Sequence, residues 1–387
     1  MKWSWMVWSM AGLLTLAGGS VWAADTGPAP VPRAVGPNCG PTHYLPPPGC
    51  PSQAPAQPGQ PGEPPAPAPA EPFAQAPEAG TQAAETYNPN MFGDLIGPFG
   101  TQRIQTGRTR LVRVPFPGGS FSLVRVPVIL EVREPLADRG TFKIADNESP
   151  RPVDRVFINY NFFDNVFGSL NPGLPRTDLH RETIGFEKTF LDRNASFGVR
   201  LPFIQLAGSD RVDDSLVGDL TFILKYAAIN DPQTGNVLSG GLALTAPTGE
   251  TNVAHLHTVL FQPWAGYIYN AGDFYAHGFT SLVVPTDSRD VTVWFNDLGI
   301  GWWLYRTGSS APLLSAVVPT AEVHVNTPLN HRGSDSTPVG FLDSVNLTFG
   351  VNWVLRQRLY FGTAVAFPVT GPQPFDVEAL GSLNFRF

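Results

Sequence analysis

The chain has 387 residues, a formal net charge of -7 and a charged fraction of 15%, against about 25% in ordinary soluble domains. This acidic balance gives no support for nucleic-acid binding, so we expect no nucleic-acid partner. Aromatic residues reach 11%, and low charge with many aromatic residues suits a barrel that is apolar outside and polar inside.

The first 23 residues, 1–23, have the features of a secretory signal peptide. An early lysine precedes an apolar stretch from Met6 to Ala17, and Val21 and Ala23 fit the small-residue rule for a cut after Ala23. A membrane anchor is the alternative, but the apolar run is short and no basic flank follows it. Later in the chain no run of about 18 apolar residues occurs, so an embedded chain must be a closed barrel.

Residues 24–90 form a low-complexity segment rich in Pro, Ala and Gln, which cannot bury enough apolar area to fold. We predict a disordered linker that is either a plain spacer or an arm for a periplasmic partner. It holds Cys39 and Cys50, which can close a small disulfide loop in an oxidising compartment. A zinc site that includes His43 would have three ligands, short of a closed tetrahedral set.

Residues 91–152 are predicted to be a transition or plug segment ahead of the barrel. Two runs around PFPGGS have the pattern of a hairpin. In the second run valines share one face, while Arg125, Glu131 and Arg133 share the other. This hairpin either supplies two more barrel strands or folds into the lumen. The polar stretch that follows ends in prolines and is expected to be irregular.

From residue 153 to the end, runs of about ten residues alternate in polarity between clusters of Gly, Pro, Asp and Asn. The pattern predicts an all-β fold over 153–387, a closed antiparallel transmembrane β-barrel of about 12 strands, with 14 strands as the alternative. The predicted strands lie near 154–165, 179–192, 194–206, 216–230, 236–248, 256–270, 272–285, 290–306, 312–327, 341–356, 357–369 and 375–387.

A soluble two-sheet sandwich also alternates, but two features of these runs favour a membrane and a lipid partner. The apolar faces are long and carry many large aromatic residues. Trp and Tyr also collect near the ends of the runs, as they do in the aromatic belts at lipid–water interfaces. The predicted belt residues are Trp264, Tyr267, Tyr269, Trp302, Trp303 and Tyr305.

The last residues, ALGSLNFRF, alternate and end in an aromatic residue. They resemble the C-terminal strand of bacterial outer-membrane proteins, which the barrel-assembly machinery reads. Phe385 and Phe387 are the residues that would carry this assembly signal. We therefore expect export through the signal peptide and localisation in the cell outer membrane.

The segment GDLTFILKYAAIN…SGGLALTAPTGE resembles a known outer-membrane transporter family, that of the phenol meta-degradation pathway protein. In that family a strand that begins Gly-Asp is followed by a Lys-Tyr pair, and the next strand ends in Pro-Thr-Gly. The similarity covers roughly residues 153–387 and includes FQPWAGYIYN and the final LNFRF. The matching residues are Gly218-Asp219, Lys225-Tyr226 and Pro247-Thr248-Gly249.

The resemblance implies a barrel with a transport role, in the wider group of outer-membrane channels for hydrophobic compounds. It does not identify a substrate, because function follows from a site and not from a fold. The Pro-rich segment and residues 91–152 depart from the compact pattern of the family. An added tether or a lumen plug would explain them.

No catalytic set stands out in the sequence, and we expect neither an enzyme nor a bound cofactor or metal. The chain lacks a G-x-S-x-G elbow and a Walker-type loop. His255 and His257 form an H-x-H pair without a predictable third ligand, so exposed loop histidines are the simpler interpretation. Glu322 and His324 either form a proton relay or hydrolase fragment, or simply hydrate the lumen.

The polar residues of the alternating runs must point into the barrel, because a charge at the middle of the lipid face costs about 2–4 kcal/mol. They either line a conduit or fill the lumen. The first reading predicts a passive channel for small, hydrophobic solutes, and the second a structural barrel with a closed lumen and a periplasmic tether. The inward residues are Asn159, Asn161, Glu187, Arg200, Asp219, Lys225, Asp297, Glu322, His324, Asn346, Glu378 and Arg386.

Overall fold

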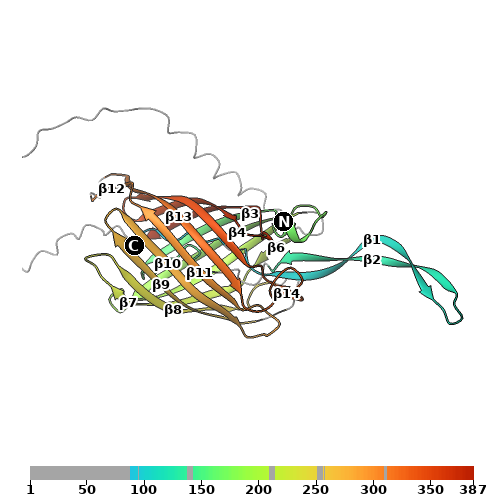
Figure 1. Cartoon of the computed structure of the whole chain (residues 1–387). Helices are drawn as coiled ribbons and strands as arrows, with labels where there is room; N and C mark the ends of the chain where they lie inside the picture. The colour runs from blue at the N-terminus through green and yellow to red at the C-terminus, as the bar shows by residue number, and fades with distance from the viewer. Residues whose placement is uncertain are drawn as a thin grey trace, which may run out of the picture. The chain divides into compact units, whose positions relative to one another are not determined.

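A computed structural model gives the fold of the chain beyond its first 87 residues (Figure 1). The predicted signal peptide, the Pro-rich segment with Cys39 and Cys50, and the His255 and His257 pair lie outside the described residues. Among the described residues no helix has the length and apolar character needed to cross a membrane. The described residues are 88–94, 96–136, 143–208, 214–250, 256, 258–308 and 312–387.

Twelve antiparallel strands form a closed barrel (Figure 1). Each strand pairs with its neighbours in the chain, and the sheet closes where the last strand pairs with the first, from Arg155↔Arg386 to Asp164↔Val377. The strands are β3 (Arg155–Asp164), β4 (Asp178–Phe190), β5 (Ala195–Ala207), β7 (Leu220–Asn230), β8 (Val237–Ala246), β9 (Leu260–Ala271), β10 (Phe274–Pro285), β11 (Val293–Trp302), β13 (Leu314–Pro328), β15 (Ser344–Leu355), β16 (Leu359–Pro368) and β17 (Val377–Arg386).

The prediction of a closed barrel of about twelve strands is therefore confirmed, and the alternative of fourteen strands is wrong. Each predicted run overlaps one of the twelve barrel strands, and none of these strands extends more than one residue beyond its run. Two short strands, β6 (Asp214–Val217) and β12 (Tyr305–Arg306), pair with β5 and β13 at the ends of the wall. They extend the wall locally without adding a full-length strand.

The two ends of the barrel differ in the length of their connections. The turn end holds the C-terminus, the short turns 191–194, 231–236, 272–273 and 356–358, and one longer connection, 303–313. The loop end holds the longer connections 165–177, 286–292, 329–343 and 369–376. A short 3-10 helix, η2 (Gly168–Leu170), and the strand β14 (Val339–Gly340) lie in loops of the loop end.

The outer face of the barrel is apolar. On β11, for example, Leu298 and Ile300 expose 43% and 57% of their surface, whereas Asp297 is 5% exposed. The same alternation of exposed and buried residues runs along the other strands, since successive side chains point to opposite faces of a sheet. A closed barrel with an apolar outside satisfies its backbone internally and is stable in lipid. The chain is an outer-membrane β-barrel protein.

The predicted belt position was wrong for two residues, Trp264 and Trp303. Trp264 shares the inward side of β9 with Gln262 and packs edge-on against Phe279, with ring centroids 5.8 Å apart. Trp303 lies just past the end of β11, and its buried ring packs against that of Tyr275. The residues that do expose their rings on the outer face are Tyr267, Tyr269, Trp302 and Tyr305.

The predicted hairpin exists, but both expectations for its place were wrong. Strands β1 (Phe99–Pro115) and β2 (Phe121–Pro135) form a separate three-stranded sheet with β14, outside the barrel wall. Figure 1 shows this hairpin at the loop end, opposite the C-terminus. Most of its side chains are exposed. We call residues 99–135 the arm.

The chain segments on either side of the arm fill the lumen. Residue Asn88 lies at the turn end, where Arg386 donates to its carbonyl, and Ile96 joins the apolar cluster of the loop end. After the arm, Ile144 packs inside the barrel, and Arg151 bonds Asn230 at the turn end again. The chain thus passes through the barrel twice. We call residues 88–94, 96–98 and 143–153 the plug.

Candidate functional site

All twelve residues that were predicted to point inward are buried. Eleven lie on barrel strands, and Asp219 lies just before β7. Most of them contact the plug and not open space. For four of them the described hydrogen bonds are to residues outside the plug: Asn161 donates to Glu378 at 2.6 Å, Asn159 donates to Asn161 at 2.9 Å, and Asp219 accepts from Gly249 at 2.8 Å. Their role as the lining of a conduit remains a prediction.

Lys143 of the plug pairs with two carboxylates, one from the plug and one from the barrel wall. Its ammonium group lies 2.7 Å from Asp94 Oδ1 of the plug and 2.8 Å from Asn326 Oδ1 of β13. It also forms an ion pair with Asp297 of β11. Asn346 of β15 donates to Asp94 at 2.7 Å, so the acid is held from a third strand. We call these residues and His324 the lysine cluster.

Glu322 projects from β13 beside His324 of the lysine cluster. The Nδ1 atom of His324 lies 2.9 Å from Asp297 Oδ1, and its Nε2 atom lies 3.2 Å from Glu322 Oε2. Glu322 accepts hydrogen bonds from the backbone N–H groups of Phe92 and Gly93 in the plug. The pair therefore holds the plug, and both side chains are 0% exposed, so a substrate has no access to them in this state.

A second cluster surrounds Glu148 of the plug with three cations from the wall. Arg155, Arg200 and Lys225 lie within 2.8, 2.5 and 2.8 Å of its carboxylate. Glu187 of β4 shares two of these cations, since it lies 2.9 Å from Arg155 and 2.9 Å from Lys225. We call these five residues the arginine cluster. Three cations against two acids leave a net positive charge.

The wall closes beside the C-terminus through Asp154, which precedes β3. Thr189 donates to its carboxylate from both backbone and side chain, at 2.7 and 2.9 Å, and Lys188 lies 3.2 Å away. Partial burial raises the pKa of Asp154, but these hydrogen bonds outweigh burial and hold the pKa below its usual range. The backbone N–H of Phe387 donates to the Asp154 carbonyl. Phe385 and Phe387 stack on the outer face.

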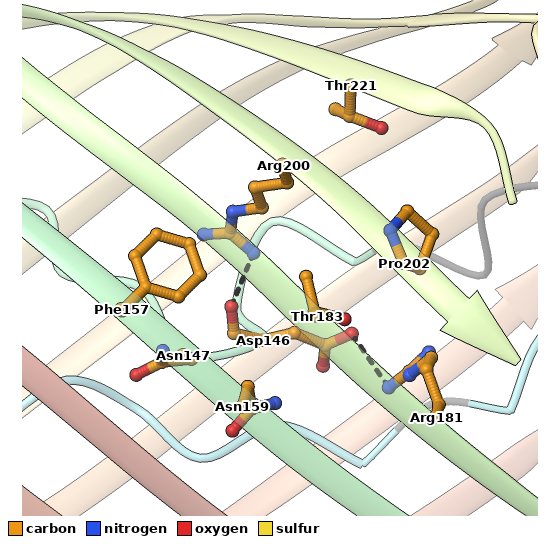
Figure 2. A pocket seen from close by; sticks show the side chains of 9 residues that line it. All are labelled: Asp146, Asn147, Phe157, Asn159, Arg181, Thr183, Arg200, Pro202 and Thr221. Atoms are coloured by element: carbon orange, nitrogen blue, oxygen red, sulfur yellow. Dashed lines mark hydrogen bonds and ion pairs between the residues drawn. The ribbon is translucent and has the colours of Figure 1, made fainter. Parts of the chain in front are cut away.

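The space left between plug and wall is small. A cavity of about 20 Å³ lies beside Asp146, whose carbonyl accepts from Arg200 at 2.6 Å and whose carboxylate lies 3.5 Å from Arg181. Figure 2 shows the side chains that line it. A second cavity, between Glu148 and the wall, has about 10 Å³. Each has room for about one water molecule, whereas a small-molecule site needs roughly 300 Å³ or more. The plug therefore closes the described lumen to solutes.

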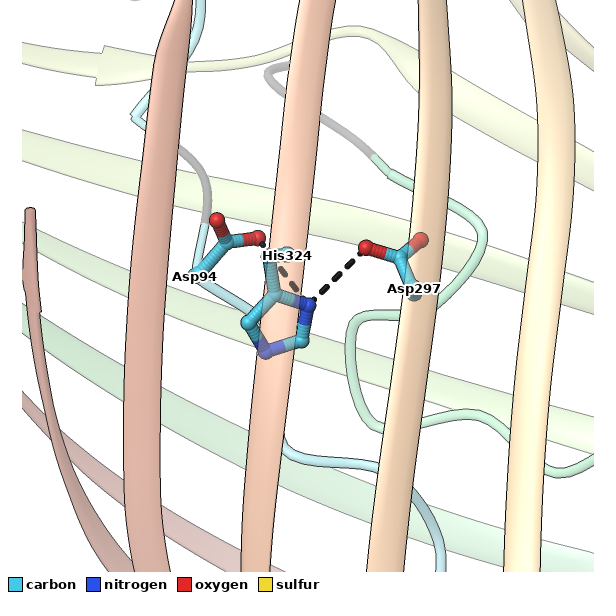
Figure 3. A group of neighbouring side chains, drawn as sticks. All are labelled: Asp94, Asp297 and His324. Atoms are coloured by element: carbon cyan, nitrogen blue, oxygen red, sulfur yellow. Dashed lines mark hydrogen bonds and ion pairs between the residues drawn. The ribbon is translucent and has the colours of Figure 1, made fainter. Parts of the chain in front are cut away.

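Asp94, Asp297 and His324 have the donor types of a metal site, with ligand atoms within 4.8 Å of one another (Figure 3). The position that a cation would take between the two carboxylates is already used by the ammonium group of Lys143. A bound metal would have to displace this buried lysine, which would then lack both of its acidic partners. The donor set fits an internal ion pair better than a metal centre.

Two of the three motifs that carried the family resemblance, Gly218-Asp219 and Pro247-Thr248-Gly249, meet at the loop end. Gly249 donates to Asp219 at 2.8 Å, and the Thr248 hydroxyl accepts from the N–H of Leu220 at 2.9 Å. A Cβ atom on Gly249 would lie 2.8 Å from the backbone of Gly218, so the glycine allows a close approach of two chains. Gly-Asp, just before β7, and Pro-Thr-Gly, just after β8, thus hold two loop-end connections together. Asp219 stabilises this contact between the two connections.

The sequence did not reveal the plug residues that complete the two clusters. Asp94, Lys143 and Glu148 lie in irregular segments, where no periodicity assigns a side chain to the lumen. One signal was available. The segment GTFKIADNESPRP carries charged residues, and it precedes a barrel whose predicted inward residues include both acids and bases. Arg155 and Arg181 were also missed, although the alternation of β3 and β4 places both on the inner face.

The chain was compared with known proteins. No protein-family model matches it, and no curated protein matches it. Among solved structures, an outer-membrane channel from Pseudomonas putida F1 is similar at 13% identity and a TM-score of 0.47, over 64% of this chain and 100% of that one. The KdgM porin is similar at 9% identity and a TM-score of 0.37, over 60% and 99%. The translocator domain of the autotransporter NalP from Neisseria meningitidis is similar at 14% and 0.38, over 61% and 88%.

Proposed function

We propose that this chain is a gated outer-membrane channel for small polar solutes, held closed by its own plug. The way in which the plug is bound carries the proposal. Backbone hydrogen bonds of the plug run within the plug, as from Met91 to Glu148 and from Asn147 to Phe92. Side chains hold it to the wall, and the wall closes through its own strand pairs. The plug can therefore leave without breaking the barrel.

A polar solute suits the wall that would remain. Without the plug the lumen would present amide, carboxylate and guanidinium groups of both signs, and solutes would diffuse down their gradient with selectivity set by width and polarity. The sequence resemblance is the one support for a hydrophobic solute and for membership of the phenol meta-degradation pathway transporter family. It rests on Gly218-Asp219, Lys225-Tyr226 and Pro247-Thr248-Gly249 alone. We therefore rank a hydrophobic solute second to a polar one.

The ends of the barrel give its orientation in this proposal. Outer-membrane barrels place short turns in the periplasm and longer loops outside the cell. The turn end would then face the periplasm, where the Pro-rich segment joins the plug at Asn88. The loop end and the arm would face outward. A periplasmic partner for the Pro-rich segment remains a prediction.

Conductance across planar bilayers tests the channel. Lys143→Met leaves Asp94 and Asp297 buried without their cation, a change that costs about 3–5 kcal/mol in comparable buried pairs. We expect the wild-type protein to open rarely and the variant to show an open probability at least about tenfold higher. Lys188→Met is the matched control, because Lys188 is exposed on the outer wall and should leave conductance unchanged.

A structural barrel is the second candidate, supported by the two buried ion clusters that fill the lumen. It predicts no conductance in the wild-type protein, in Lys143→Met or in a Lys143→Met/Glu148→Gln double variant. That result, with each protein folded as judged by its heat-modifiable migration in gels, would overturn the channel proposal.

A further inference from the structure

The arm is firmly anchored at its base. Phe99 is 0% exposed, pairs with Gly340 of β14 and packs its ring 5.5 Å from that of Phe167. Asn171 of the barrel loop accepts from the Arg133 N–H at 2.9 Å and donates to the Arg133 carbonyl at 2.7 Å. The barrel thus fixes the position of the arm. A loop that only connects two segments would not need such anchoring.

Beyond this base the arm is basic and apolar on both faces. Four arginines, Arg108, Arg110, Arg113 and Arg125, lie there, and no Asp or Glu occurs between residues 104 and 130. The base arginines differ, because Arg103 and Arg133 both lie within 4 Å of Glu131. The outer arm therefore carries four positive charges without an acid of its own.

The arginines alternate with aliphatic side chains across the two strands. Leu111 pairs with Arg125 and Arg113 with Leu123, so these four form a checkerboard on one face. Arg110 pairs with Val126 on the other face. Leu111 and Leu123 expose 59% and 54% of their surface. Exposed apolar side chains of this extent on an isolated hairpin indicate a surface that a partner covers.

The edge of the arm is open to a partner strand. Among the described residues, β2 pairs with β1 alone, and β14 covers only the base of β1. Pairing with a second copy would set arginine beside arginine, and like charges across a strand pair are unfavourable. Lipid head groups are also a poor fit, because Arg108 lies nine residues beyond Phe99, roughly 30 Å along the strand.

We propose that the arm binds an extended segment of another protein in which acidic and aliphatic residues alternate. The segment adds as a strand to the free edge of β2. Its backbone pairs with that edge. Its carboxylates meet Arg113 and Arg125 on one face, and its aliphatic side chains cover Val124 and Val126 on the other, because successive side chains of a strand point to opposite faces. This partner class goes beyond channel activity, and it does not depend on whether the plug opens.

Binding of a synthetic twelve-residue peptide of alternating Glu and Val to the full chain in detergent tests this proposal. The probes for comparison are a Lys/Val peptide, a twelve-nucleotide single-stranded DNA and vesicles with anionic phosphatidylglycerol. We expect the Glu/Val peptide to bind, the Lys/Val peptide not to bind, and backbone amides of β2 to exchange hydrogen more slowly in the complex.

The combined variant Arg108→Ser, Arg110→Ser, Arg113→Ser and Arg125→Ser should weaken peptide binding at least about tenfold, since it removes the complementary charge. Arg176→Ser with Arg332→Ser is the matched control, because both are exposed arginines of the loop end that already pair with acids, Asp164 and Asp343. The proposal is overturned by absent peptide binding, by equal loss in the control, or by DNA or vesicles that bind as well as the peptide.

Discussion

At the scale of residues, the lumen is organised by buried charges that join plug and wall. A buried ion pair adds little net stability compared with an apolar filling, but loss of one partner is costly because the other remains without compensation. Lys143 and Glu148 are such partners, one in each cluster. The plug is therefore held by a few residues whose substitution has a large effect.

Glu148→Gln should lower the thermal unfolding midpoint of the purified protein. The amide leaves Arg155, Arg200 and Lys225 with Glu187 as the one remaining carboxylate of the arginine cluster, at a cost of about 3–5 kcal/mol. Glu182→Gln, at an exposed position on the outer side of β4, is the control and should leave the midpoint unchanged. Equal midpoints for wild type and Glu148→Gln, followed by circular dichroism, would contradict this role.

Single residues were predictable where strands fix their direction. The period of two placed Glu187 and Lys225 inside, because a neighbouring outward position would have set a charge in lipid. The same reasoning could not find Asp94 or Lys143, since their partners lie as far as 252 positions away in the chain. Trp264 was wrongly placed in the outer belt because its aromatic character was given more weight than its position. It lies two residues after Gln262 and therefore on the same, inward face of β9.

At the scale of elements, the arm shows why a hairpin pattern does not fix its location. Its strands alternate just as barrel strands do. The distinguishing feature is charge on both faces: Arg110 and Arg125 belong to opposite faces of the paired strands. Charge on both faces is costly for a barrel strand, because one face must meet lipid, although β4 carries Glu182 and Lys188 on its outer face. The charges on both faces therefore argued against placing these two strands in the wall.

Gly249→Ala tests the contact between the chain before β7 and the chain after β8. An added Cβ would lie 2.8 Å from backbone atoms of Gly218 and Val217, so one of the two segments must shift, at about 1–3 kcal/mol. We expect a lower unfolding midpoint and faster hydrogen exchange in the backbone around Gly218 and Gly249. Gly381→Ala on β17 is the control, since a Cβ there meets no atom within 4 Å. Unchanged exchange in these two segments of Gly249→Ala would show that the glycine has no packing role.

At the scale of the whole molecule, the account depends on the path of the chain. The plug starts at the turn end beside Arg386, leaves at the loop end into the arm, and returns to the turn end before β3 begins at Arg155. The sequence predicted the barrel and a plug or transition segment. It could not predict a double passage, because this follows from contacts between distant segments and not from local pattern.

Trypsin treatment of intact cells that produce the protein tests this path most directly. We predict cleavage in the arm, after Arg108, Arg110, Arg113 or Arg125, while a periplasmic marker protein stays intact and the barrel remains in the membrane. Mass spectrometry of the released peptides identifies the cuts. Protection of the arm in intact cells, with cleavage there only after the outer membrane is permeabilised, would contradict the passage of the chain through the barrel to the cell surface.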